Sequence, residues 1–450
     1  MIQRKFFGLF LCCTFVLSGC ETKPKDPAME KIRRAGTLVV LTRNAPTTYF
    51  EGREGPEGFE YRLTQLLGRA LQVKVEYVLL DSVEEVLHAI DNGEGDLAAA
   101  GLTRTDSRAK RYRFGPGYKV IQQQVVCHRD GKLPKKTEDL PGVTLEVVAG
   151  NAYGDRLDEL KTQVAGLKWT ETDDLSTDQV LERVFRKQVD CTVADSHIVA
   201  LNRRYFPDLT VAFALSEGQP LAWVLPKNAN YLAGFLEKWF SEIEDDAVLE
   251  RLNARYYGYA EIVDYFDPSA FSRHVRERLP SLRPRFEKAS VATGIPWKLL
   301  AALSYQESRW NPKARLPLGR RGMMMLSRVE AERLGVHDPY ATGQSIMGGA
   351  RYLARFMKRL PEGIVAEDRH WFALAAYSIG LHHLEDARSL AGQMGKNADS
   401  WEEMQTVFPL LSVKKYFRTL KYGYARGWEP VTKVRRIRDY LAILEREDED

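Results

Sequence analysis

Short apolar runs alternate with amphipathic stretches through the first half of the chain. Residues 38–42, 73–80 and 96–100 have the composition or the alternation of β-strands, whereas residues 58–71 and 82–92 have the spacing of helices. Strands that alternate with helices are typical of α/β domains with a largely parallel sheet. The pattern therefore predicts an α/β fold for this part of the chain.

The same alternation continues further along and predicts a second α/β lobe, from Val143 to about Leu225. Its expected elements are strands at 143–148 and 189–193 and helices near 152–162 and 176–187. We expect helices after residue 228 to complete one two-lobed domain that spans residues 31–262.

The hydrophobic pattern changes after Asp267-Pro268, where helical spacing replaces the strand-like alternation. Short loops with Gly or Pro separate the expected helices, and this pattern predicts an all-α domain over residues 269–450. Two folded domains agree with the length of 450 residues, which is too long for one ordinary hydrophobic core.

One helix of the second domain carries a carboxylate on its apolar face. Pro296 suits the first turn of this helix, and Asn311-Pro312 should follow its end. The residues expected to share the face are Leu299, Leu300, Leu303, Glu307 and Trp310. Because burying a bare charge is costly, Glu307 must be paired or neutral. It is either a structural partner of a nearby Arg or a catalytic group at the edge of a cleft.

Composition and charge narrow the possible partners. The chain is 44% hydrophobic and 28% charged, as folded proteins are, and its net charge of +4 is small for its length. This charge gives no argument for nucleic acid, and we expect no such partner, although it would not oppose an anionic polymer. His382 and His383 are adjacent, so on a helix they point to different sides and cannot easily chelate one ion. We expect no metal site and no cofactor, since the sequence has no motif for either.

The first residues have the pattern of a targeting segment. Arg4 and Lys5 precede an apolar stretch, residues 6–17, that is too short to span a bilayer. Leu17-Ser18-Gly19-Cys20 resembles the lipobox of bacterial lipoproteins, which implies that residues 1–19 are a signal peptide. The alternative is an ordinary cleaved signal peptide with an incidental Cys.

The lipobox resemblance also implies a location. The Cys20 thiol would receive lipid, residues 20–30 would form a polar tether, and Glu21 after the Cys favours the periplasmic face of the outer membrane. After this processing only Cys127 and Cys191 keep free thiols. In an oxidising compartment a disulfide between them is possible but not required.

Three ordered motifs in the first domain resemble the family 3 periplasmic solute-binding proteins. They are Gly58-Phe59-Glu60-Tyr61-Arg62-Leu63, Asp91-Asn92-Gly93-Glu94-Gly95-Asp96-Leu97 and Thr103-Arg104-Thr105-Asp106-Ser107-Arg108, followed by Phe114, Pro116 and Tyr118. The resemblance implies a two-lobed α/β domain like those of periplasmic binding proteins, with a regulatory ligand between the lobes. Arg108 would bind a ligand carboxylate, for which a guanidinium fork is suited, and Asp195 would bind a ligand amine.

Such a ligand would be an amino acid or a fragment of a muropeptide, and the first domain would sense it. The loop Ala149-Gly150-Asn151-Ala152 lacks the hydroxyl residue that the family often has there. In the alternative interpretation, Arg108 and Asp195 are ordinary ion-pairing residues on a scaffold that has lost its ligand.

Several ordered motifs in the second domain resemble the lytic transglycosylases of the soluble, goose-lysozyme-like class. They are Glu307-Ser308 with Asn311-Pro312, Gly322-Met323-Met324-Met325-Leu326, and the segments 344–353, 371–380 and 421–427. The resemblance implies an all-α, lysozyme-like (goose-type) fold. It also implies action on peptidoglycan glycan strands in cell-wall turnover. The β-1,4 bond between N-acetylmuramic acid and N-acetylglucosamine would be cleaved without water, leaving 1,6-anhydromuramyl ends.

The same resemblance implies roles for single residues. Glu307 would first protonate the leaving oxygen and then accept the proton of the muramyl C6 hydroxyl, so one carboxyl group would serve as acid and base. Tyr377 would face Glu307 across the cleft. The positions expected to contact the substrate are Ser308, Met324, Met325, Ser378 and Tyr424. Tyr377 and the Met residues have an alternative role, which is packing in the core.

Four positions depart from the family pattern, and one of them is Met325, where the family often has Gln. Leu316, Ser378 and Lys433 stand where Ser, Asn and Tyr are often found, and the first two remove polar groups expected near the sugar or Glu307. Two other functional hypotheses therefore remain. One is a ligand-binding lipoprotein whose helical domain is a degenerate murein anchor, and the other is a hydrolase that uses water. Anhydro product ends would separate a transglycosylase from a hydrolase.

Overall fold

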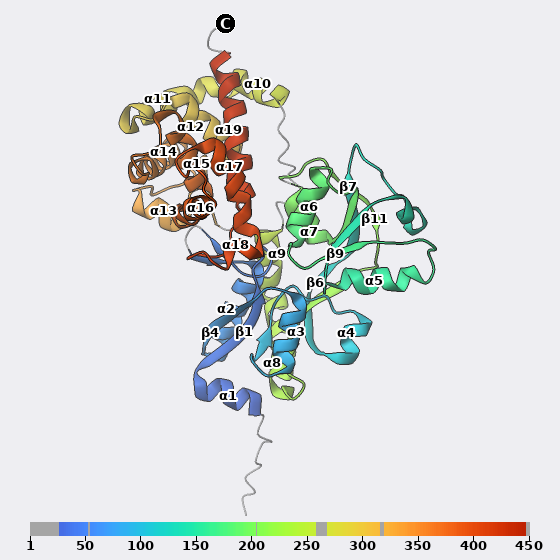
Figure 1. The fold of residues 1–450 in the computed structure, drawn as a ribbon. Helices are drawn as coiled ribbons and strands as arrows, with labels where there is room; N and C mark the ends of the chain where they lie inside the picture. Colours follow the sequence, from blue (N-terminus) through green and yellow to red (C-terminus); the bar gives the residue numbers. More distant parts are fainter. Residues whose placement is uncertain (1–26, 53–54, 204, 258–267, 316–318, 447–450) are drawn as a thin grey trace, which may run out of the picture.

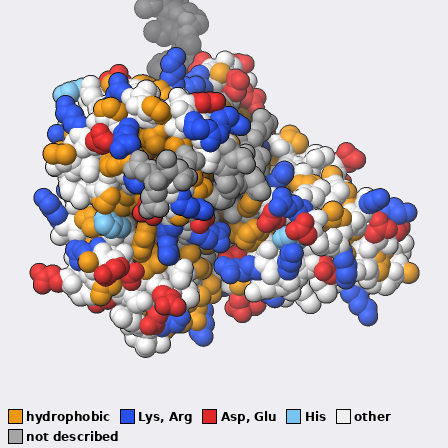
Figure 2. Space-filling model, turned by 90° about the horizontal axis from the view of Figure 1, so that it is seen from above, with side chains coloured by type: hydrophobic (Ala, Val, Ile, Leu, Met, Phe, Trp, Pro, Cys, Tyr) orange, Lys and Arg blue, Asp and Glu red, His pale blue; other side chains and the backbone are white. Residues whose placement is uncertain are grey.

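The computed structural model describes residues 27–446 except 53–54, 204, 258–267 and 316–318. The expected signal peptide at 1–19, the lipidation at Cys20 and the departure at Leu316 lie outside the described residues. Within the part of the chain that is described, no helix is both long enough and apolar enough to cross a bilayer. Basic and acidic side chains are interspersed on the face drawn in Figure 2.

The first half of the chain forms two α/β lobes, coloured from blue to green in Figure 1. The strands of the first sheet, in spatial order, are β4 (Lys74–Leu80), β1 (Thr37–Arg43), β5 (Leu97–Ala98), β12 (Gln219–Leu225) and β6 (Arg113–Ile121). β1 pairs in parallel with β4 and β5, whereas β12 pairs antiparallel with β5 and β6. Leu38 and Val40 pack in one hydrophobic cluster and Leu41 in another, so both faces of this sheet are buried.

The second lobe has a sheet of its own. Its strands, in spatial order, are β11 (Leu209–Ala214), β7 (Gln123–His128), β10 (Cys191–Asp195), β8 (Leu145–Val148) and β9 (Thr170–Thr172). β8 pairs in parallel with β9 and β10, and β7 pairs antiparallel with β10 and β11.

Two sequence predictions about these lobes are wrong. The sheets are mixed rather than largely parallel, because the chain crosses between the lobes twice, from β6 to β7 and from β11 to β12. The second lobe was also expected to reach about Leu225. Its sheet ends with β11 at Ala214, and β12 returns to the first sheet. Strand order depends on pairing between distant segments, which local alternation does not encode.

Helices cover both sheets and confirm the two-lobed α/β prediction. They are α1 (Pro27–Ala35), α2 (Phe59–Leu71), α3 (Val83–Asp91), α4 (Asp106–Arg111), α5 (Ala152–Lys161), α6 (Thr177–Phe185), α7 (Ser196–Asn202), α8 (Asn230–Asp245) and α9 (Val248–Tyr256), with the 3₁₀ helix η1 (Thr137–Gly142). A small hairpin joins β2 (Phe50–Gly52) and β3 (Gly55–Glu57). The expected tether at 20–30 is too long, because α1 begins at Pro27 and buries Met29 and Ile32 in the core of the first lobe.

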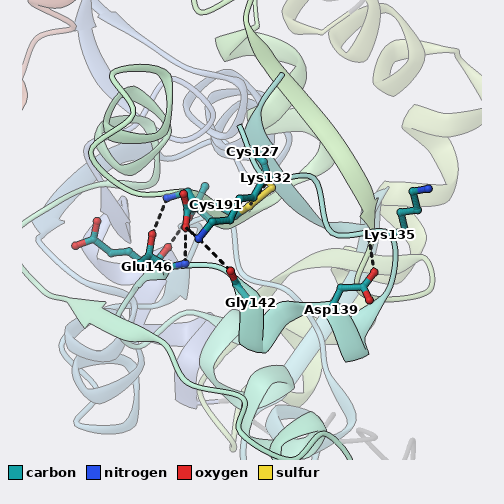
Figure 3. Close-up of a disulfide and its surroundings, with 10 residues drawn as sticks. Cys127, Lys132, Lys135, Asp139, Gly142, Glu146 and Cys191 are labelled. Atoms are coloured by element: carbon teal, nitrogen blue, oxygen red, sulfur yellow. Dashed lines mark hydrogen bonds and ion pairs between the residues drawn. A yellow bond between two sulfur atoms is a disulfide. The ribbon is translucent and has the colours of Figure 1, made fainter. Parts of the chain in front are cut away.

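A disulfide joins Cys127 on β7 to Cys191 on β10, and both residues are buried (Figure 3). The two strands pair at these residues, which are 64 positions apart in the chain. Beside the disulfide, the Lys132 ammonium contacts the Asp190 carboxylate and the Gly142 carbonyl oxygen, each at 3.1 Å. The two cysteines are thus paired, a point that the sequence left open.

The second half of the chain is helical, as predicted. Its helices are α10 (Pro268–Glu277), α11 (Leu279–Thr293), α12 (Trp297–Ser308), α13 (Arg328–Arg333), α14 (Thr342–Arg359), α15 (Ala366–Ile379), α16 (Leu381–Gln393), α17 (Trp401–Val407), η2 (Phe408–Ser412), α18 (Lys414–Phe417) and α19 (Trp428–Arg446). Almost every residue of α12 is buried, and α19 packs along it. Figure 1 shows α19 running from the free end of the helical domain down to the junction with the lobes.

The ends of α12 differ slightly from the prediction. Pro296 is the residue before the helix, which begins at Trp297. Arg309 and Trp310 have positive φ angles of 51° and 55°, so the helix stops at Ser308 and Trp310 leaves the predicted helical face. The Trp310 indole N–H nevertheless donates to the Ala301 carbonyl oxygen at 2.9 Å, which holds the turn against the helix.

The helical domain is fastened to the second lobe by aromatic packing. Trp428, the first residue of α19, lies in a hydrophobic cluster of the second lobe, with its ring centroid 4.4 Å from that of Tyr205 and 5.1 Å from that of Phe206. The Arg426 guanidinium lies over the rings of both Trp428 and Tyr205. Desolvated aromatic and cation–π contacts of this kind are stable, directional links between domains.

Polar contacts fasten the helical domain to the first lobe. Lys414 and Arg418 form ion pairs with Asp81, which precedes α3. His383 on α16 contacts the carbonyl oxygen of Glu51 on the β2–β3 hairpin at 3.1 Å from its Nε2. The helical domain therefore contacts both lobes of the first domain.

We expect the double substitution Cys127→Ala, Cys191→Ala to lower the free energy of unfolding by about 2–4 kcal/mol, because the unfolded chain regains the entropy of a long open loop. Denaturant unfolding of the oxidised protein would measure the difference. Reducing agent should lower the stability of the wild type to that of the variant. Equal unfolding midpoints without reductant would contradict the expectation.

Candidate active site

Glu307 lies in the last turn of α12, as the sequence predicted. Its side chain is only 4% exposed, and its Oε1 is 3.4 Å from Nζ of Lys433 on α19. A buried carboxylate must be compensated, and this ammonium does so. The partner is thus a Lys from a distant helix and not the Arg considered from the sequence.

Lys433 is shared between two carboxylates. Its Nζ is also 3.6 Å from Oε1 of Glu429, one helical turn earlier on α19. Burial alone would lower the pKa of Lys433, but Glu307 and Glu429 outweigh this effect and raise it, so the ammonium stays charged. Lys433, noted from the sequence as a departure from the usual Tyr, is therefore an electrostatic part of the site.

Glu429 connects this pair to the first domain. Burial alone would raise the pKa of Glu429, but Lys433 and Arg426, with a hydrogen bond from the Tyr205 side chain, hold it below its usual value. The Arg426 guanidinium is 3.8 Å from the Glu429 carboxylate. Sequence reasoning missed Glu429 and Tyr205. The spacing of Glu429 and Lys433 by four residues was the available clue to the first of them.

The loop before α13 is fixed beside Glu307 by hydroxyl groups. Ser308 Oγ contacts the Met323 carbonyl oxygen at 2.9 Å, and the Tyr377 hydroxyl donates to the Met324 carbonyl oxygen at 2.6 Å. Gly322 has φ +77°, and a Cβ there would lie 1.8 Å from the Pro339 carbonyl oxygen, so only Gly fits. The structure thus brings Ser308 and Tyr377 to one loop and directs their hydroxyls into the protein.

The predicted substrate contacts of Met324 and Met325 are not supported. Both side chains are buried, and Met325 has a positive φ of 47°. Met324 packs so tightly on α14 that a Cβ at Gly349 would lie 2.5 Å from it. The alternative role that the sequence allowed, core packing, describes both residues, and the glycine serves close packing rather than chemistry.

Ser378 and Tyr424 lie apart from each other. Ser378 follows Tyr377 on α15, and its Oγ is buried without a hydrogen-bond partner among the described residues. Tyr424 is buried at the junction of the helical domain with both lobes, where it lines a cavity with Asp81 and Asp173. Tyr424 thus lies in the segment that turns toward the first domain, and its contact with the sugar stays a prediction.

The two regulatory positions of the first domain meet in the cleft between the lobes. Arg108 from α4 and Asp195 from the end of β10 line the same small cavity, of about 20 Å³, together with Arg43. A space of this size holds about one water molecule. The Arg108 guanidinium donates across the cleft to the Gly150 carbonyl oxygen at 3.0 Å, so the lobes are closed on each other.

Asp195 is a buried acidic residue, and one of its carboxyl oxygens, Oδ1, makes no hydrogen bond to the described residues. Burial raises the pKa of Asp195 to about 7, although Arg108 and Arg43 oppose this rise. Sequence reasoning missed Arg43, which is the last residue of β1 and belongs to none of the motifs. The cleft thus combines two guanidinium groups with a carboxyl group that titrates near neutral pH.

Comparison with known families assigns both halves of the chain. Residues 37–259 match the model of the bacterial extracellular solute-binding proteins, family 3, and residues 284–400 match that of the transglycosylase SLT domain. Both matches agree with the two resemblances found in the sequence.

Relatives match over nearly the whole length. The chain is 44% identical to membrane-bound lytic murein transglycosylase F 2 of Alkalilimnicola ehrlichii, over 97% of each chain. It is 40% identical to membrane-bound lytic murein transglycosylase F of Maricaulis maris, over 98% of each chain. Among solved structures, an ancestral arginine-binding protein bound to arginine aligns with a TM-score of 0.45 and 23% identity, over 49% of this chain and 98% of that one.

We expect Lys433→Met to lower the free energy of unfolding by about 3 kcal/mol, because two buried carboxylates lose their shared cation. Adding Glu307→Gln should restore part of the loss. The unfolding midpoint in urea, followed by Trp fluorescence, would measure both effects. Lys358→Met, on the exposed side of α14, is the matched control. Strictly additive effects of the two substitutions would argue against the ion pair.

The cleft predicts a pH effect on stability. Because the pKa of Asp195 is raised from 3.8 to about 7 in the folded state, the folded protein holds a proton that the unfolded chain has lost between these values. Stability should fall as pH rises through this window, and Asp195→Asn should remove about 2–4 kcal/mol of that fall.

Melting temperatures of wild type and Asp195→Asn between pH 4.5 and pH 8 would test this effect, with Asp155→Asn at the half-exposed rim as control. The melting temperature of Asp195→Asn relative to that of the wild type should rise with pH. A difference that is constant with pH would contradict the assigned titration.

Proposed function

Because this chain belongs to the membrane-bound lytic murein transglycosylase F family, we propose that Glu307 performs both proton transfers of its reaction. The chain is a peptidoglycan lytic transglycosylase. The observation that carries the proposal is the Glu307 carboxylate at the end of α12, almost fully buried and held by one ammonium group. Buried carboxyl groups at such positions are suited to proton transfer.

The reaction cleaves the β-1,4 bond between N-acetylmuramic acid and N-acetylglucosamine without adding water. Glu307 gives its proton to the glycosidic oxygen as the bond from that oxygen to C1 breaks. It then takes the proton of the muramyl C6 hydroxyl, whose oxygen forms the new bond to C1. The product is a 1,6-anhydromuramyl end, and Glu307 finishes protonated as it began.

Before the first step, Lys433 has to move away and Glu307 has to take up a proton, because the structure holds Glu307 as a carboxylate paired with the Lys433 ammonium. This ammonium lies against Oε1 of Glu307, one of the two oxygens that can deliver a proton to the substrate. Glu429 is 3.6 Å from the same ammonium, so Lys433 keeps an anionic partner when it leaves Glu307. Tyr377 and Ser308 act as positioning residues, since their hydroxyl groups fix the loop at Met323 and Met324.

Glu429 also raises a second candidate function, hydrolysis by two carboxylates. A pair separated by about 6.5–9.5 Å can activate a water molecule in an inverting glycosidase. Glu429, however, is tied to Arg426 and Tyr205 at the domain junction, which leaves it poorly placed to bind a water on the substrate. The chemistry of the product ends distinguishes the two functions.

For the first domain the proposal is a small zwitterionic ligand, an amino acid or a muropeptide fragment, that regulates the enzyme. Support comes from the unpaired oxygen of Asp195, which would meet an amine, and from Arg108 and Arg43, which would meet a carboxylate. The closed cleft holds about 20 Å³, so binding requires the lobes to separate.

The proposed location is the periplasmic face of the outer membrane, with a lipid anchor at Cys20. Support comes from the lipobox-like sequence alone. Because α1 begins at Pro27, only residues 21–26 would separate the lipid from the folded first lobe.

Glu307→Gln should lower the rate of peptidoglycan cleavage by about 10²–10⁴-fold, the usual contribution of a general acid or base. The measurement is mass spectrometry of purified peptidoglycan after digestion with lipid-free protein. Glu332→Gln, an exposed carboxylate of α13, is the matched control and should retain full activity.

Anhydromuropeptides from the wild type and the control, but not from Glu307→Gln, are expected. Reducing ends instead of anhydro ends would favour the hydrolase. Absence of products from all three proteins, with and without amino acids or peptides, would favour the ligand-binding lipoprotein with a degenerate helical domain.

A further inference from the structure

A cavity of about 550 Å³ lies where the β2–β3 hairpin of the first lobe meets the helical domain. β3 and α2 contribute one side of it, and α13, α14 and the start of α16 contribute the other. It is separate from the cleft between the lobes and from the ion pair of Glu307 and Lys433. The two domains form this cavity together.

Four arginines line this cavity. They are Arg62 of α2, Arg333 of α13, and Arg355 and Arg359 of α14. Arg355 and Arg359 are one helical turn apart, a spacing that places two guanidinium groups on the same face. Within the described ranges, no side-chain hydrogen bond or ion pair engages Arg333, Arg355 or Arg359. The Nε of Arg62 is buried and has no hydrogen-bond partner among the residues that the structure describes.

The cavity has fewer carboxylates than guanidinium groups. Glu57 and Glu330 are its two acidic residues. Glu330 is committed to the capping box of α13, where it accepts the Ser327 backbone N–H at 2.8 Å. The cavity therefore has an excess of positive charge and free guanidinium donors, which suit carboxylate or phosphate oxygens.

Aromatic residues also line this cavity, and they lead toward the proposed active site. Tyr352 and Phe356 of α14 line the cavity, and the Tyr352 ring centroid is 5.3 Å from that of Tyr377. Tyr377 in turn holds the loop beside Glu307 through Met324. A single aromatic ring thus separates the arginine cavity from the proposed catalytic machinery.

We propose that this arginine cavity binds the acidic peptide carried by the peptidoglycan strand, next to the bond that is cleaved. The proposal rests on the proposed function, because it assumes that glycan strands are the substrate. Peptide stems carry several free carboxylates on a flexible backbone. Guanidinium groups from three helices around 550 Å³ match a ligand with several anionic groups better than one small ion.

The enzyme should therefore distinguish strands with peptides from bare glycan. Because the cavity binds a part of the substrate that does not react, its contacts are the same in ground state and transition state. They should lower KM and leave kcat unchanged. Wild type is expected to have a KM about threefold to tenfold lower for strands with peptides than for strands stripped by an amidase, since exposed ion pairs each contribute modestly.

The test compares wild type with Arg355→Gln, Arg359→Gln on both substrates, using the full chain. The matched control is Lys288→Gln, Lys358→Gln, which removes two exposed positive charges from the same domain outside the cavity. The arginine variant should lose the preference for peptide-bearing strands through KM alone, and the control should keep it. An unchanged preference in the arginine variant, or an equal loss in the control, would overturn the proposal.

A binding measurement keeps the test independent of catalysis. In the Glu307→Gln background, strands with peptides should bind more tightly than stripped strands, and the two Arg substitutions should abolish the difference. This result would support the cavity even if no anhydro product were ever found. In a second set of measurements, inorganic phosphate at 10 mM is added as a competitor for the cavity. If phosphate removes the preference while added free stem peptide at the same concentration does not, the cavity is a phosphate site and the proposal fails.

Discussion

A buried carboxylate at the end of α12 constrains the rest of the molecule. As a carboxylate, Glu307 needs a compensating charge inside the helical domain, and Lys433 supplies that cation from α19. The pair joins two helices that pack along each other. Because Trp428 at the start of α19 packs among residues of the second lobe, the helix that carries Lys433 also connects the active site to the first domain.

The helical domain holds the two lobes in one arrangement. Asp81 of the first lobe pairs with Lys414 and Arg418, while Tyr205 of the second lobe packs on Trp428. The lobes are closed in this state, with the cavity at Asp195 almost filled. A ligand that separates the lobes has to strain one set of these contacts. Tyr205 also bonds to Glu429, so that strain would be felt at the shared ammonium of Lys433.

Local pattern predicted most elements but not their pairing. The spacing of apolar residues placed β1, α2, α3 and α12 within a few residues, and the change of pattern after Asp267-Pro268 coincides with the start of α10 at Pro268. The lobe boundary was misplaced because β12 pairs with strands far away in the sequence. Likewise, nothing local links Glu307 to Lys433, which are 126 residues apart. For the same reason, the sequence did not place Tyr424 at the junction of the helical domain with both lobes.

Trp428 has a consequence for how such a protein can evolve. The match to the solute-binding family ends at residue 259 and the match to the transglycosylase family begins at residue 284, as if the two halves were separate modules. The hydrophobic packing crosses this boundary, because the Trp428 indole at the start of α19 belongs to a hydrophobic cluster of the second lobe. Recombination between the two halves would expose the apolar residues of the second lobe that contact Trp428. It would also expose the Trp428 side chain itself. Exchange of one half for another is therefore expected to require a matching change at this contact.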